Sequence, residues 1–115
     1  MPPAEQELDT DASDFLLGWY FDDELFSELA DNSLHINTKE LLALRRVLEE
    51  IGPRLSPGTL RWNVDNTAAQ YAIINQGSNR SRKLCDLAVK ILLLAESLHV
   101  YIEPVQFSSE VNKTL

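Results

Sequence analysis

Residues 37–65 read NTKELLALRRVLEEIGPRLSPGTLRWNVD, a helix signal followed by a strand signal. Asn37 and Glu40 have the spacing of a capping box, with Asn37 as the cap. The apolar residues that follow recur at helical spacing until a Gly-Pro pair stops the run: Leu41, Leu44, Leu48 and Ile51. Residues 60–64 alternate between apolar and polar side chains, as a half-buried strand does, and end at Asp65. This stretch therefore predicts one helix that connects a preceding strand to a following one.

Upstream of this stretch, the sequence predicts strands joined by short turns. Residues 8–11 and the aromatic run 15–21 (FLLGWYF) are expected strands. Residues 24–30 (ELFSELA) are ambiguous between a third strand and a helical turn. Residues 1–7, with two prolines, are expected to be an N-terminal linker.

Downstream, two helices and a last strand are predicted. A short helix runs from Thr67 to about Asn75, and a longer one opens near Ser81 with leucines on one face. The final strand covers about 100–107, and Pro104 makes it an edge or bulged strand because proline lacks a donor. The element order indicates an α/β domain in which hairpin-linked strands come first and crossover-linked parallel strands follow.

Composition limits the classes of function. The 115 residues are enough for one domain, and a net charge of −8 argues against binding nucleic acid by charge alone. This net charge is compatible with an acidic site whose bound cations reverse the local sign of the charge.

The single cysteine, Cys85, excludes an intramolecular disulfide and favours an intracellular, reducing compartment such as cytoplasm or nucleus. No apolar run is long enough to span a membrane, and the first residues lack the basic and then apolar profile of a signal peptide.

Three carboxylates fall where open α/β sheets place their sites. Asp11 ends the first strand, Asp65 ends a strand expected to lie parallel beside it, and Glu40 begins the connecting helix. Carboxylates that converge there repel one another unless a cation holds them, and oxygen ligands suit Mg²⁺ or Mn²⁺. Each residue also has an ordinary interpretation: Glu40 as the capping-box partner of Asn37, Asp65 as a helix cap, and Asp11 as a turn residue.

Five short motifs, in register along the chain, resemble those of the ribonuclease H domain of reverse transcriptases. The likeness is to long-terminal-repeat and tyrosine-recombinase retrotransposons in particular, and it runs from about residue 8 to residue 113. The motifs are Asp11-Ala12-Ser13, Gly18-Trp19, His35-Ile36-Asn37 with Glu40-Leu41-Leu42-Ala43, Val64-Asp65-Asn66-Thr67, and Gln76-Gly77-Ser78.

The resemblance implies an α/β fold with a five-stranded mixed sheet of order 3-2-1-4-5, flanked by helices. It also implies hydrolysis of the RNA strand of RNA–DNA hybrids by two Mg²⁺ or Mn²⁺ ions. Asp11, Glu40 and Asp65 take the positions of the catalytic metal ligands, with Asp11 as the bridging one. The expected partners are the hybrid itself and the polymerase domain of a reverse transcriptase.

Substrate contacts are expected beside this site. Asn66 and Thr67 stand at a helix start, where free N–H groups can meet phosphate, and Ser13 belongs to the first motif. Arg80 and Arg82 belong to the basic cluster of the sequence and are expected to contact phosphates.

The family pattern continues with a fourth carboxylate on a final helix, and the sequence ends at Leu115, where these would follow. The domain is therefore expected to span 8–115 and to be truncated before that helix. The alternative is a non-catalytic scaffold or binding module of the same fold that supports a polymerase. Another nuclease branch with this fold, such as a resolvase or integrase, matches the motifs less well.

Overall fold

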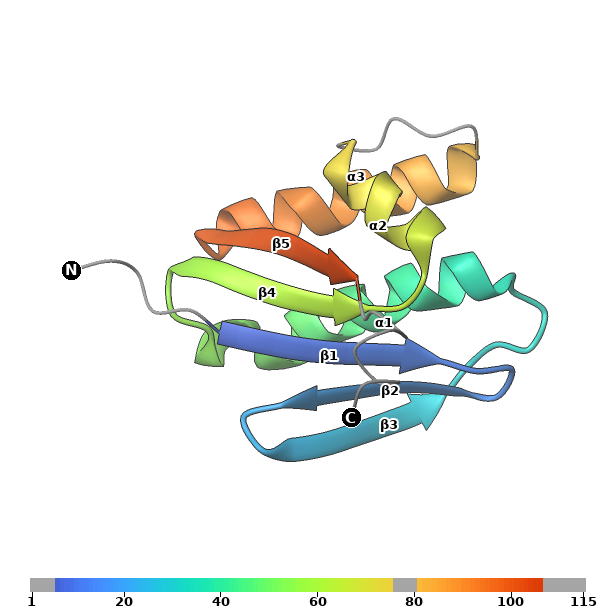
Figure 1. Cartoon of the computed structure of the whole chain (residues 1–115), viewed down its shortest axis with the longest axis horizontal. Coiled ribbons are helices and arrows are strands. Elements are labelled where there is room, and N and C mark those ends of the chain that lie inside the picture. Colours follow the sequence, from blue (N-terminus) through green and yellow to red (C-terminus); the bar gives the residue numbers. More distant parts are fainter. Residues whose placement is uncertain (1–5, 76–80, 107–115) are drawn as a thin grey trace, which may run out of the picture.

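The computed structural model of the chain describes residues 6–75 and 81–106. Within these ranges there are five strands and three α-helices, which follow one another in the expected order, and a short 3₁₀ helix (Figure 1). They are β1 (Gln6–Ala12), β2 (Leu16–Phe21), β3 (Glu24–Leu29), α1 (Ile36–Ile51), η1 (Gly52–Arg54), β4 (Gly58–Val64), α2 (Thr67–Ile74), α3 (Arg82–Ser97) and β5 (Val100–Gln106). β1 begins at Gln6, so the strand starts two residues earlier than the sequence pattern predicts. None of the helices within these ranges is long and apolar enough to cross a membrane.

The sheet has the order β3-β2-β1-β4-β5, which confirms the predicted mixed topology. β2 is antiparallel to both β1 and β3, whereas β4 is parallel to both β1 and β5. The ambiguous segment 24–30 forms the edge strand β3, because it pairs with β2 along its whole length. β5 is the other edge strand, the position that Pro104 predicts.

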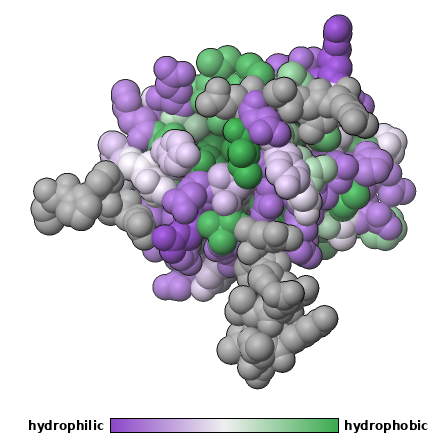
Figure 2. Space-filling view, turned by 45° about the horizontal axis from the view of Figure 1, so that its top comes forward, coloured by the Kyte–Doolittle hydropathy of each residue, from purple (hydrophilic) through white to green (hydrophobic). Residues whose placement is uncertain are grey.

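The helices cover one face of the sheet (Figure 1). Along β1 the side chains alternate: Leu8 and Thr10 are buried toward the helices, whereas Asp11 is exposed on the opposite face. Leu25 and Leu29 of β3 lie on that opposite face and are 80% and 83% exposed. Figure 2 shows a largely hydrophilic surface interrupted by apolar patches.

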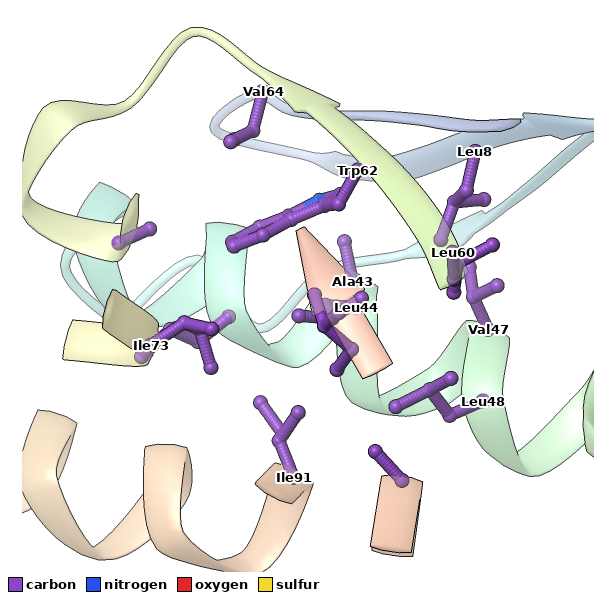
Figure 3. Packing of buried hydrophobic residues seen from close by; sticks show 14 of the residues in the cluster. Leu8, Ala43, Leu44, Val47, Leu48, Leu60, Trp62, Val64, Ile73 and Ile91 are labelled. Carbon is purple, nitrogen blue, oxygen red and sulfur yellow. The ribbon is translucent and has the colours of Figure 1, made fainter. Parts of the chain in front are cut away.

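The core fills the layer between this sheet and the helices. Figure 3 shows the indole of Trp62 extending from β4 into the layer, where Leu44 of α1 and Ile91 of α3 also point. Trp62 is fully buried, and its Nε1 donates a hydrogen bond to Thr10 Oγ1 at 2.7 Å. The one polar group of this large side chain is thereby satisfied, and the bond ties β4 to β1.

The start of α1 differs from the prediction. The N-cap is His35, whose Nδ1 accepts the backbone N–H of Asn37 at 3.1 Å, and Ile36 is the first helical residue. The capping box with Asn37 as the cap is therefore wrong. Asn37 lies inside the helix, where its Oδ1 accepts a hydrogen bond from Asn66 Nδ2 at 2.8 Å. Glu40 is consequently free of a capping role.

Candidate active site

Asp11 and Asp65 lie side by side at the carboxyl ends of two central strands. In the parallel pair β1–β4, Asp9 is level with Asn63, and the same register continued by two residues brings Asp65 level with Asp11. Both carboxylates are exposed, and both line an open hollow of about 660 Å³. This is the edge of the sheet at which open α/β folds bind their ligands.

Glu40, the third predicted carboxylate, is buried on α1 and accepts a hydrogen bond from the backbone N–H of Ala12, next to Asp11. The residue is 5% exposed, and within the described ranges its Oε2 has no hydrogen-bond partner. Buried polar atoms are nearly always hydrogen-bonded, so an unpaired carboxylate oxygen indicates a place where something else can bind.

The pKa of Glu40 shows that the three carboxylates share one electrostatic environment. Burial is the largest cause that raises this pKa, and the charge of Asp11 raises it next. A backbone hydrogen bond from Ala12 lowers it in part, while the charge of Asp65 raises it further, to about 7 from 4.5. A carboxyl group shifted in this way by burial and by like charges is typical of functional sites.

The three carboxylates are suitable ligands for a hard divalent cation, but their side chains are not arranged around one. Oxygen donors are the ligands that Mg²⁺ and Mn²⁺ prefer, and Glu40 offers a free oxygen. In residues 6–75 and 81–106, however, no three Asp, Glu, His or Cys side chains are arranged to hold one ion. Asp11 instead accepts the backbone N–H of Ala12 with Oδ1 at 2.9 Å. Closing these groups around an ion therefore requires side-chain movement.

Two of the predicted substrate-contacting residues are already engaged in local structure. Ser13 Oγ accepts the N–H groups of Phe15 and Leu16 at 3.4 and 3.1 Å, which closes the turn after β1. Asn66 Oδ1 accepts the N–H of Ala69 at 2.7 Å, so Asn66 is the N-cap of α2. The interpretation of Asp65 as the cap of this helix is thus wrong, because the residue that follows it takes that role.

The remaining predicted contacts stand at helix starts or outside the described residues. Thr67 and Arg82 are the exposed first residues of α2 and α3, and Ser81 caps α3 through Leu84 N–H at 3.3 Å. Arg80, together with the fifth motif at 76–78, lies outside the described residues.

Lys39 was not singled out from the sequence. It is 2% exposed, and its Nζ donates to the backbone oxygen of Asp14 at 2.9 Å. The signal that could have identified it is spacing, because Lys39, Ala43 and Val47 are separated by four residues and form one buried stripe of α1. A lysine in such a stripe stands out, because lysine is rarely fully buried unless its ammonium group has a partner.

Comparison with known proteins supports the fold. No protein-family model matches the chain, and no curated protein does. Among solved structures, ribonuclease H1 from the halophilic archaeon Halobacterium salinarum NRC-1 is similar, with a TM-score of 0.73 and 14% sequence identity. The alignment covers 96% of this chain and 90% of that one. At this identity the likeness establishes the architecture, and the chain has a ribonuclease H-like fold.

Proposed function

We propose that this chain is a metal-dependent ribonuclease H that hydrolyses the RNA strand of RNA–DNA hybrids. The observation that carries the proposal is the buried Glu40, with its unpaired oxygen, whose pKa is raised by burial and by Asp11 and Asp65. These carboxylates belong to three separate motifs, and the parallel register of β1 and β4 supports a common site at the ends of these strands. The motifs further suggest the ribonuclease H domain of a retroelement reverse transcriptase, with a polymerase domain as partner.

Asp11, Glu40 and Asp65 would hold the ions. When bound, such a metal pair activates the attacking water and stabilises the leaving 3′ oxygen. The protein's own part is to present ionised carboxylates from two strands and one helix. Glu40 must lose its proton to take part, and its neighbours Asp11 and Asp65 disfavour this until a cation arrives. Thr67 and Arg82 would contact phosphates from helix starts.

A second candidate function is a non-catalytic module of the same fold. It is favoured by the lack of a formed three-ligand cluster within 6–75 and 81–106, and by the net charge of −8. Such a module would serve as a scaffold for a polymerase and would not depend on ionised Glu40.

Cleavage of a labelled RNA–DNA hybrid with Mg²⁺ or Mn²⁺ separates the two candidates, with RNA and DNA duplexes as substrate controls. We expect cleavage of the RNA strand in the hybrid alone. Asp65→Asn should lower the rate on the order of 10³-fold, about 4 kcal/mol of transition-state stabilisation. Asp86 is an exposed acid on α3, so Asp86→Asn is the matched control, and this variant should cleave at the wild-type rate. A folded chain that binds hybrid but cleaves none would favour the scaffold.

A further inference from the structure

Lys39 is a buried lysine that joins α1 to the turn between β1 and β2. It belongs to the largest fully buried side chains of the described residues, and its ammonium group donates to the carbonyl oxygen of Asp14 at 2.9 Å. An ammonium–carbonyl hydrogen bond is charge-assisted and stronger than one between neutral groups. Because 25 residues separate the two partners in sequence, the bond is a long-range connection.

The turn that Lys39 contacts is closed by bonds of its own. The backbone N–H of Ser13 donates to the oxygen of Leu16 at 2.8 Å, and Leu16 N–H donates back to Ser13 Oγ at 3.1 Å. Ala30 N–H donates to the oxygen of Phe15 at 2.8 Å. Lys39 binds the carbonyl of Asp14, in the middle of this turn, so the bond connects the turn directly to α1.

This connection lies between two of the proposed metal ligands. Asp11 precedes Asp14 by three residues on the same chain segment, and Glu40 directly follows Lys39 on the helix. The Lys39–Asp14 bond is therefore a short bridge from the strand end that carries Asp11 to the helix turn that carries Glu40.

Packing alone does not favour a lysine at this buried position. A methionine would fill the same volume without the cost of removing an ammonium group from water, and the carbonyl of Asp14 is a neutral partner. A carboxylate also lies within electrostatic reach: hydrogen bonds from Ser33 are the main cause of the lowered pKa of Asp31, and the charge of Lys39 contributes. Residues that reduce stability while fixing geometry are typical of functional sites.

We propose that Lys39 is a positioning residue, whose bond to the Asp14 carbonyl holds the β1–β2 turn against α1 and thereby sets the separation of Asp11 and Glu40. The metal-binding consequence of this inference rests on the proposed function, whereas the fastening of the turn does not. The side chain contacts neither substrate nor metal in this role.

Amide hydrogen exchange of the full chain tests the fastening of the turn. In Lys39→Met, the amides of Phe15 and Leu16 should exchange at least about tenfold faster, because a hydrogen bond to a charged donor has been lost. Amides of β4 should keep their wild-type rates, and Lys90→Met, an exposed lysine on α3, should change neither set. Unchanged exchange at Phe15 and Leu16 in Lys39→Met would overturn the inference. Lys39→Gln, with a shorter donor, gives the same comparison if the methionine variant does not fold.

Mn²⁺ binding, titrated by calorimetry, tests the consequence for the site. We expect Lys39→Met to bind Mn²⁺ about tenfold more weakly than wild type, and Lys39→Arg to recover part of this loss. The Tm of Lys39→Met should be equal to that of wild type or higher. A purely structural role would lower Tm and leave the affinity of the folded protein unchanged, which would contradict positioning. If the wild-type chain binds no Mn²⁺, the proposed function fails, and the exchange rates alone decide the inference.

Discussion

At the scale of single residues, Glu40 connects the stability of the protein to pH. Its pKa is about 7 in the fold against 4.5 in the unfolded chain, so the folded state holds the proton more tightly. Between these two values the unfolded chain releases the proton and the folded chain keeps it. Stability therefore falls as pH rises through this window, is constant above it, and carries no contribution from Glu40 below it.

Replacing the carboxyl group removes this dependence. Glu40→Gln should be more stable than wild type at pH 8, by up to about 3 kcal/mol, since one pKa unit is worth about 1.4 kcal/mol. The difference should vanish near pH 4. Urea unfolding at several pH values in EDTA measures it, with the exposed Glu96→Gln on α3 as the control. Equal stability of the Gln variant and wild type at pH 8 would show that Glu40 ionises without penalty.

The sequence predicts three carboxylates for this site, but it does not predict their local partners. Asp11, Glu40 and Asp65 could be chosen because strand ends and a helix start are visible in the pattern. The roles of Asn37 and Lys39 could not, because each depends on a contact more than 20 residues away, with Asn66 and Asp14 respectively. Local propensity carries no information about such long-range pairs.

At the scale of elements, Asn66 has two functions at the start of α2. Its Oδ1 caps the helix through Ala69 N–H, and its Nδ2 donates to Asn37 Oδ1 on α1. Asn66→Ala removes both, and we expect a loss of about 1–2 kcal/mol in the free energy of unfolding. Asn66→Ser retains a capping oxygen without the bridge to α1, so chemical denaturation should place it between Ala and wild type. If the Ser and Ala variants are equally unstable, capping is not what the side chain contributes.

The elements themselves were largely predictable. The three α-helices of the described residues, together with β4 and β5, follow the predicted order, because apolar spacing and proline act locally. Segment 24–30 stayed ambiguous because its apolar residues come as two adjacent pairs, 25–26 and 29–30, and do not alternate with polar ones. Leu25 and Leu29 point outward there, and only pairing with β2 settles the segment as β3.

For the molecule taken as a whole, the net charge affects how a hybrid could bind. Topology was predictable from the motif order, but affinity for nucleic acid depends on the balance of charge. With a net charge of −8, the chain as a whole repels phosphates, and attraction must come from bound cations and a few basic residues. Arg80 and Arg82 are the predicted phosphate contacts, and Arg82 is exposed at the start of α3.

The salt dependence of hybrid binding measures the number of phosphate contacts. Each phosphate contact releases about 0.9 counterions, so two contacts predict a slope near −2 in a plot of log K against log salt concentration. Binding should therefore weaken ~10–20-fold when the salt concentration rises from 50 to 200 mM. Fluorescence anisotropy with Asp65→Asn and a labelled hybrid, at constant Mg²⁺, gives this slope. Arg82→Ala should make it shallower by about 1, whereas Lys90→Ala should leave it unchanged. A slope steeper than about −5 would require a basic surface that this composition does not suggest, and would place the binding of the hybrid on residues other than those proposed.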